Sequence, residues 1–225
     1  MKEYIGILKD TELFSGLAEE DILSMLSCLG ARLRYYKKGE YLLRQGEIIG
    51  DILLLAEGKV LIQREDYWGN RSILSSLSPG DMFGEAYAAP GSGPLLNDAT
   101  ALTDCTVIFL DINRVIGICS AACPFHALVL RNFVFAMSGK NRALVQKLGH
   151  MSRRSTREKL MSYLSLEAGK QASAEFSIPF SRQQLADFLS VDRSAMSAEL
   201  GRMRDEGLIE FHRSCFKLLH GKYEE

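Results

Sequence analysis

The stretch from Ser181 to Gly207 constrains the fold more than any other part of this 225-residue chain. Ser181 and Gln184 have the spacing of a capping box, in which each side chain caps the other residue's backbone, so they predict a helix that begins at Arg182. Asp192 is a suitable N-cap for a second helix, and the final glycine can end it. The stretch therefore predicts two short helices joined by a tight turn, the helix-turn-helix unit.

The second predicted helix has an apolar face and a polar face. Met196, Leu200 and Met203 recur at helical spacing, which predicts its buried side. In helix-turn-helix proteins this helix enters the major groove of DNA. The candidate DNA-binding residues, on its exposed side and at the start of the first helix, are Ser181, Arg182, Gln183, Arg193, Ser194, Ser197, Ala198 and Arg202.

These candidates differ in what they can contact. Arg193 can bind guanine through two nitrogens, whereas Ala198 can meet only a thymine methyl group. Ser181, with the unpaired N–H groups of its helix and with Arg182, can hold a phosphate. Residues 208–219 predict a β-hairpin, the wing of a winged helix. The alternative is a helical hairpin with no role in nucleic-acid binding.

Short apolar runs separated by glycine-containing turns dominate the N-terminal half of the chain. The runs are Tyr41–Leu43, Asp51–Ala56, Val60–Gln63, Ser72–Leu77 and Thr106–Leu110. Glycine tolerates the positive φ that tight turns between antiparallel strands require. Runs at this spacing predict a closed antiparallel sandwich or roll.

A long helix is predicted to begin near Pro124, a residue suited to the first turn of a helix. Apolar residues spaced alternately by four and three form an a/d seam, which predicts a dimer interface. The seam consists of Leu130, Val134, Met137, Asn141, Leu144, Leu148 and Met151. Asn141 is the single polar member, and one polar residue in such a seam can specify the register and a two-stranded state. The alternative is that the stripe packs on the chain's own β-domain.

The predicted fold class is α+β, with an antiparallel jelly-roll-like β-roll, a dimerisation helix and a winged helix-turn-helix. We expect the β-roll sensor domain at residues 1–123, the dimerisation helix at 124–151 and the DNA-binding domain at 152–225. A helix from Arg154 to Ala168 is expected to open the last domain, with Gly169 as its left-handed cap.

Composition excludes several classes of protein. The net charge is −1, so the DNA-binding prediction depends on local geometry rather than on a basic field. No apolar run is long enough to span a membrane, and the first residues are too polar for a secretory signal, so we expect a cytoplasmic protein with no membrane partner. The sequence contains no GxSxG, P-loop or HExxH motif, so we do not expect an enzyme.

The run from Ile178 to Ser197 resembles the helix-turn-helix of the CRP/FNR regulators. The N-terminal half is similar to the sensor β-roll of the same family, through Leu13–Leu17, Lys38–Glu40, Gly58–Val60 and Pro79–Glu85. The resemblance implies a homodimeric transcription regulator that binds a palindromic operator in double-stranded DNA. It also implies RNA polymerase as a partner, and a small effector whose binding in the roll reorients the DNA-binding domains.

The effector pocket departs from the family pattern. The family's Gly-Glu is present as Gly84-Glu85, but Leu95-Leu96 replaces the Arg-Ser or Arg-Thr pair that holds the cyclic phosphate. Burial of that anion without a charged partner is costly, so cyclic AMP is not the expected effector. The resemblance places the pocket at Gly84, Glu85, Ala86, Leu95, Leu96 and Leu144. A less polar effector, a haem or a redox signal stays open, and the cofactor is unknown.

The five cysteines are an odd number and form no CxxC pair, so a disulfide framework is not expected. Only Cys28 lies in the first hundred residues, which argues against the N-terminal iron–sulfur cluster of some family members. Cys119, Cys123 and His126 are spaced by four and three residues, so a metal, haem or redox role for this set is open. Isolated cysteines are usually buried as small hydrophobic residues, so no metal is predicted.

The predicted function is therefore that of a DNA-binding transcription regulator that responds to a small effector other than cyclic AMP. The alternative is a ligand-binding or interaction module that lacks specific DNA recognition.

Overall fold

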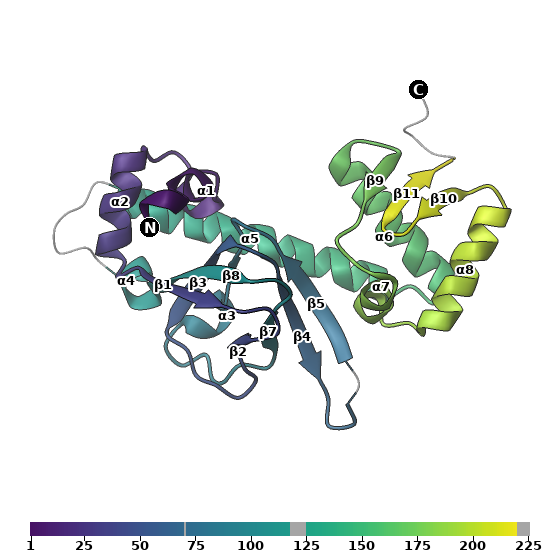
Figure 1. Cartoon of the computed structure of the whole chain (residues 1–225), viewed down its shortest axis with the longest axis horizontal. Helices are drawn as coiled ribbons and strands as arrows, with labels where there is room; N and C mark the ends of the chain where they lie inside the picture. The colour runs from purple at the N-terminus through teal and green to yellow at the C-terminus, as the bar shows by residue number, and fades with distance from the viewer. Residues whose placement is uncertain (70, 118–124, 220–225) are drawn as a thin grey trace. The chain divides into compact units, whose positions relative to one another are not determined.

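The computed structural model describes residues 1–69, 71–117 and 125–219 (Figure 1). The chain divides into two compact units. The first comprises Met1–Asn70 with Leu74–Asn141, and the second comprises Arg71–Ile73 with Arg142–Glu225. No helix among the described residues is long and apolar enough to cross a membrane.

The strands before helix α5 (His126–Met151) form two four-stranded sheets, ordered β1-β8-β3-β6 and β2-β7-β4-β5, and all lie in the first unit except the first three residues of β5. The strands are β1 (Arg32–Tyr36), β2 (Tyr41–Leu43), β3 (Asp51–Glu57), β4 (Val60–Glu65), β5 (Arg71–Leu77), β6 (Met82–Phe83), β7 (Asp98–Ala101) and β8 (Cys105–Asp111). Pairing is antiparallel between β1 and β8, between β3 and both β6 and β8, and between β7 and both β2 and β4. The predicted antiparallel roll is confirmed.

Strand β3 is buried on both faces and so joins two cores. Leu53 and Leu55 pack with residues of both sheets, including Val60 and Phe109. Because side chains alternate along a strand, Ile52, Leu54 and Ala56 point the other way, toward the helices. This double burial explains why the strand is an unbroken apolar run in the sequence rather than an alternating one.

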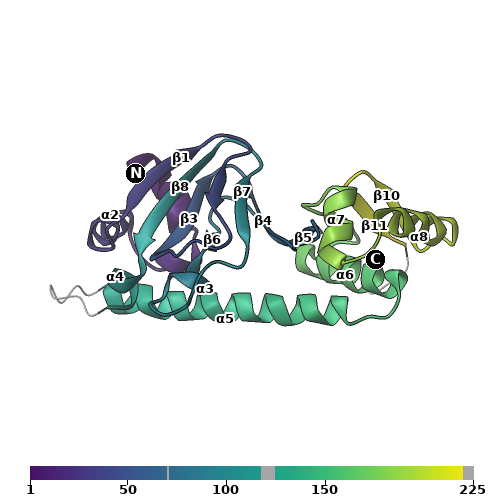
Figure 2. The same cartoon turned by 90° about the horizontal axis from the view of Figure 1, so that it is seen from below.

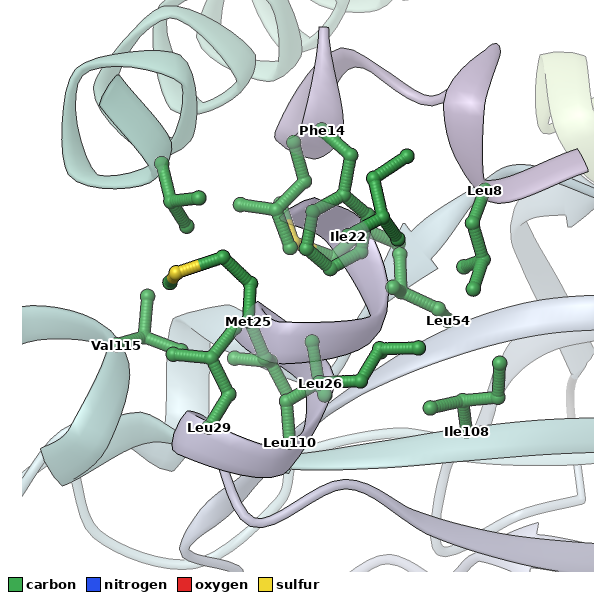
Figure 3. Packing of buried hydrophobic residues seen from close by; sticks show 14 of the residues in the cluster. Leu8, Phe14, Ile22, Met25, Leu26, Leu29, Leu54, Ile108, Leu110 and Val115 are labelled. Atoms are coloured by element: carbon green, nitrogen blue, oxygen red, sulfur yellow. The ribbon is translucent and has the colours of Figure 1, made fainter. Parts of the chain in front are cut away.

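The second core lies between the sheet that contains β3 and the N-terminal helices (Figure 3). The N-terminal helices are η1 (Lys2–Tyr4), α1 (Ile5–Lys9), η2 (Glu12–Phe14) and α2 (Glu19–Cys28), and α4 (Ile112–Ile116), which follows β8, adds to the same core. Phe14, Ile22 and Met25 are fully buried there, against Leu54 and Leu110 of the sheet.

Helix α5 (His126–Met151) is continuous, as predicted (Figure 2). In its first half, Val129 and Ala136 are buried in the helix–sheet core. The amide of Asn132 donates to the carbonyl oxygens of Leu13 and Ser15, at 3.2 and 2.8 Å. This buried amide therefore fixes the start of α5 to the N-terminal segment.

The second unit is a winged helix-turn-helix. Its elements are α6 (Thr156–Gln171), β9 (Glu175–Ser177), α7 (Arg182–Leu189), α8 (Arg193–Asp205), β10 (Ile209–His212) and β11 (Cys215–Leu218), with strand order β10-β11-β9. The expected cap at Gly169 is wrong. Helix α6 continues to Gln171, and Ala172 takes the left-handed conformation with φ +47°.

Candidate nucleic-acid interface and effector pocket

The capping box predicted at Ser181 is present and begins α7. The Ser181 hydroxyl accepts from the Gln184 N–H at 3.3 Å, and the Gln184 side chain accepts from the Ser181 N–H at 2.8 Å. The turn after α7 places Ser190 in the left-handed conformation, with φ +52°. The Lys159 ammonium of α6 donates to the carbonyls of Leu189 and Ser190, at 3.2 and 3.3 Å, which ties this turn to the supporting helix.

Helix α8 begins as predicted, because the Asp192 carboxylate accepts from the Ala195 N–H at 2.7 Å. Its inner face is fully buried, with Met196, Leu200 and Met203 each at most 1% exposed. The candidate residues Arg193, Ser194, Ser197 and Ala198 are all exposed. Packing of the inner face therefore presents these four side chains to solvent together at the start of α8.

The two arginines proposed on α8 differ in their surroundings. Arg202 Nη2 lies 2.7 Å from Glu199 Oε2, and Arg157 of α6 lies 3.5 Å from Glu199 Oε1. Arg157 also pairs with Glu206, which raises the pKa of the arginine and lowers that of the carboxyl. Among the described residues, Arg193 forms no ion pair, so its guanidinium is available to a ligand.

Arg182 packs on the wing. Its guanidinium carbon lies 4.7 Å from the centre of the Phe211 ring and 4.8 Å from that of Phe216, distances typical of cation–π contacts. Burial lowers the pKa of Arg182. The residue therefore connects α7 to the wing, and a phosphate contact would have to form alongside this stacking. Gln183 is exposed and its amide donates to Asp187 at 2.8 Å.

The sequence analysis included Arg213 in the predicted wing hairpin but not among the candidate DNA-binding residues. Arg213 is exposed and has φ +52° in the turn between β10 and β11. The register that pairs His212 with Cys215 leaves only Arg213 and Ser214 in the turn. The polar sequence between two apolar segments predicted the hairpin and its link, but a role for Arg213 in DNA binding was not considered.

The candidate effector residues are divided between a tight turn and the sheet core. Gly84, with φ +81°, precedes the short helix α3 (Glu85–Ala88), and Ala86 is exposed on it. Leu95 is buried between the sheets at 2% exposure, whereas Leu96 is half exposed. Leu144 belongs to the second compact unit.

A cation that the sequence analysis did not anticipate meets this turn. Lys140 Nζ of α5 lies 2.8 Å from Glu85 Oε1 and also donates to the Met82 carbonyl. The Glu85 side chain is only 11% exposed, and its Oε2 is buried without a hydrogen-bond partner among the described residues. The carboxylate therefore has one oxygen in an ion pair and one oxygen with unused hydrogen-bonding capacity.

The proposed dimer seam lies largely on the open side of α5. Val134, Leu144 and Leu148 are 53%, 62% and 66% exposed, and Asn141 is exposed as well. Leu130 is half-buried, and Met137 packs partly against the helix–sheet core. Two apolar side chains outside the predicted seam, Phe135 and Val145, are also more than half exposed. The helix thus has a broad apolar face that this chain does not itself cover.

Of the proposed cysteine–histidine set, Cys119 and Cys123 lie outside the described residues, and His126 is buried at the start of α5. Among the residues that the structure describes, no three histidine, cysteine or acidic side chains are grouped to hold a metal ion.

Two family models match this chain. One describes a cyclic nucleotide-binding domain and matches residues 33–121, and the other describes a Crp-like helix-turn-helix domain and matches residues 158–220.

Curated relatives and solved structures agree with these matches. The chain is 25% identical over 202 residues to the cyclic AMP receptor protein of Thermus thermophilus, which covers 90% of this chain and 89% of that protein. It is 26% identical over 229 residues to cGMP-dependent protein kinase 2 of Rattus norvegicus, covering 97% of this chain but only 28% of the kinase. The fold is similar to that of CLP of Xanthomonas campestris, with a TM-score of 0.72 at 16% identity, over 91% of this chain and 100% of CLP. With a cyclic nucleotide-binding domain followed by a Crp-like helix-turn-helix domain, the chain belongs to the CRP/FNR family of regulators.

Proposed function

We propose that this protein is a transcription regulator that binds an inverted-repeat operator in double-stranded DNA as a homodimer. The observation that carries the proposal is the exposed start of α8, where Arg193, Ser194, Ser197 and Ala198 all face solvent while the inner face around Met196 is buried. A helix presented in this way can enter the major groove and contact base edges. RNA polymerase is the partner that such a regulator would engage.

Arg193 is the proposed base-reading residue. Its guanidinium is exposed and forms no ion pair within the described part of the chain, so binding guanine would break no existing pair. Arg202 is already paired with Glu199, which makes it better suited to a phosphate contact or to orientation of the helix. The capped N-terminus of α7 at Ser181 supplies the proposed phosphate contact.

The proposed effector is a small molecule other than cyclic AMP. The pair that would hold a cyclic phosphate is Leu95-Leu96, and Leu95 is 2% exposed in the inter-sheet core. The nearby cation, Lys140, is already paired with Glu85. An effector phosphate that drew on Lys140 would compete with Glu85 for this cation, which argues against cyclic nucleotide binding.

The first experiment selects binding sequences from random double-stranded DNA with the purified full chain, with and without a small-molecule extract. Enrichment of an inverted repeat with half-sites about one helical turn apart would support the dimeric regulator. Dependence on the extract would support effector sensing. No enrichment under either condition would favour an interaction module without specific DNA recognition.

Arg193→Ala tests the base-reading residue on the selected operator. We expect specific binding to weaken by about 1–3 kcal/mol, with relaxed preference at one base pair per half-site. Arg64→Ala removes the same charge from an exposed position at the end of β4 and should leave affinity unchanged. Unchanged base preference in the Arg193 variant would remove this residue as a base reader.

A further inference from the structure

Two side chains with acid–base chemistry meet in the first unit, away from the surfaces discussed above. Cys28 is the last residue of α2, and His126 is the first residue of α5. Cys28 Sγ lies 4.0 Å from His126 Nδ1, at the outer limit for a hydrogen bond that involves sulfur. The residues are 98 positions apart in the sequence, so only the folded chain brings the thiol to the imidazole.

The environment of His126 leaves its second nitrogen unsatisfied. The residue is 7% exposed, and its Nε2 is buried with no hydrogen-bond partner in the described structure. Buried polar atoms are nearly always paired in native proteins, so an orphan of this kind calls for an explanation, and a redox role is one. In the tautomer that carries its proton on Nε2, the lone pair on Nδ1 faces the Cys28 sulfur and can accept the thiol proton.

One cation lies beside Cys28. Arg114 Nη1 lies 3.5 Å from the Cys28 carbonyl oxygen, which brings a guanidinium beside this residue. Cys28 stands at the negative end of α2, which acts against a thiolate, and the positive end of α5 begins at His126, which acts in the opposite direction. Cys28 is half-buried. Thiols with adjacent cations and partial exposure are the reactive ones in proteins.

We propose that Cys28 is a modification site at which a hydroperoxide oxidises the thiol to a sulfenic acid, with His126 as the proton acceptor. His126 first takes the thiol proton. The thiolate sulfur then forms a bond to one peroxide oxygen while the O–O bond breaks. With hydrogen peroxide, the departing hydroxide takes the proton from the imidazolium and leaves as water. The sulfur is oxidised, the peroxide is reduced, and His126 returns to its neutral form.

An effect of His126 on Cys28 can be distinguished from an effect of solvent exposure alone, because the other described cysteines serve as two references in the same chain. Cys105 is buried, at 3% exposure. Cys215 is exposed on the wing, and its sulfur lies 3.3 Å from the Ser177 hydroxyl. If exposure decided reactivity, Cys215 would react first. If the imidazole decides it, the half-buried Cys28 reacts first.

The experiment exposes the reduced, purified full chain to limiting hydrogen peroxide and follows each thiol over time. Remaining thiols are alkylated and counted at each cysteine by peptide mass spectrometry, and sulfenic acid is trapped with a cyclic diketone. We expect Cys28 to lose its thiol about tenfold faster than Cys215, with Cys105 slowest. Counting the remaining thiol registers the reaction even if the sulfenic acid goes on to a disulfide.

His126→Asn and His126→Gln test the proton acceptor, with thermal melting as the check on folding. Either folded variant should slow the loss of the Cys28 thiol by about tenfold and leave the rate at Cys215 unchanged. A wild-type Cys28 that reacts no faster than Cys215 would overturn the proposal, whatever the variants do. A fast Cys28 in a folded His126 variant would overturn it as well.

Discussion

Lys140 and Glu85 form an ion pair that joins the long helix α5 to the turn carrying the candidate effector residues, with Nζ and Oε1 2.8 Å apart. The pair is partly withdrawn from solvent, since the lysine side chain is 37% exposed and the glutamate side chain 11%. The same ammonium donates to the Met82 carbonyl just before this turn. One lysine therefore holds both a side chain and the backbone of the turn against α5.

Removal of the lysine should cost more than removal of the carboxylate charge. Lys140→Met leaves Glu85 largely buried without a cation, so we expect a loss of about 2–4 kcal/mol in the free energy of unfolding. Glu85→Gln removes the negative charge, and the ammonium keeps its hydrogen bond to the Met82 carbonyl. This variant should therefore lose about 1 kcal/mol in the free energy of unfolding. Urea unfolding of both variants measures which one loses more free energy of unfolding. Equal losses would show that the carboxylate is not held by this ion pair.

A solvent-exposed ion pair in the same unit supplies the control. Lys37 and Asp104 are 2.8 Å apart, but their side chains are 80% and 63% exposed. Lys37→Met should therefore change the unfolding free energy by no more than about 1 kcal/mol.

A double variant at Lys140 and Glu85 should lose less free energy of unfolding than the sum of the two single losses, because both substitutions remove the same interaction.

Gly58→Ala should be among the most destabilising single-methyl changes in the β-domain. Gly58 has φ +93°, and an added Cβ would lie 2.4 Å from the Asp104 carbonyl oxygen and 2.6 Å from Cys105 Sγ. Gly39 has φ +88° with nothing within 4 Å of the same position. Gly39→Ala should cost about 1–2 kcal/mol from its backbone alone, and Gly58→Ala about 1–3 kcal/mol more, by thermal or urea unfolding. Equal costs would contradict the close approach seen at Gly58.

Stability should fall in mild acid through His150. Burial lowers the pKa of His150, helped by the charges of Lys170 and Arg153 and opposed by Glu167. Its Nδ1 lies 2.7 Å from the Ser162 hydroxyl. The unfolded chain therefore binds a proton at higher pH than the folded chain does. The contribution of His150 to the free energy of unfolding is complete above the ordinary histidine pKa of about 6.5. It is lost as the pH falls through the lower pKa of His150 in the folded chain.

Melting temperatures between about pH 7.5 and 5.5 measure this effect of His150. His150→Asn keeps a polar side chain that does not titrate in this range, so it should flatten that part of the profile. An identical slope in wild type and variant would assign the acid sensitivity to other groups.

The helix-turn-helix could be predicted from sequence because its determinants are local. The capping residues Ser181 and Asp192 act within three positions of themselves, and both cap as predicted. Strand β1 was missed because its sequence, Arg32–Tyr36, is polar and half exposed and has no apolar run. The end of α6 was placed too early because Ala172 takes the left-handed conformation that a glycine usually takes.

Contacts between distant parts of the chain could not be predicted in this way. Lys140 is one of several polar residues on a long helix, and nothing in the local pattern distinguishes it until Glu85 is placed beside it. The same holds for Cys28, which the sequence analysis considered only as a possible cluster ligand. Its proximity to His126 follows from the packing of α2 against the start of α5.

The structure changes how the dimer prediction should be tested. Met137 and Leu144 both belong to the predicted seam, but Met137 packs partly against the chain's own core whereas Leu144 is 62% exposed. Aspartate at position 137 would place a charge in that core and destabilise each subunit, so loss of a dimer in this variant would not identify an interface. Leu144 is therefore the informative position.

Leu144→Asp should yield folded monomers. In the isolated chain the side chain already faces solvent, so the melting temperature of a monomer should change by only a few degrees. In a coiled-coil dimer the same charge would be buried at an a or d position, so sedimentation should show dissociation and operator affinity should fall at least tenfold. Gln146→Asp, at an exposed neutral position outside the seam, adds the same single negative charge to the helix and is the control. A Leu144→Asp protein that sediments as a dimer and retains operator affinity would contradict the seam, and the exposed Phe135 and Val145 would become the next residues to test.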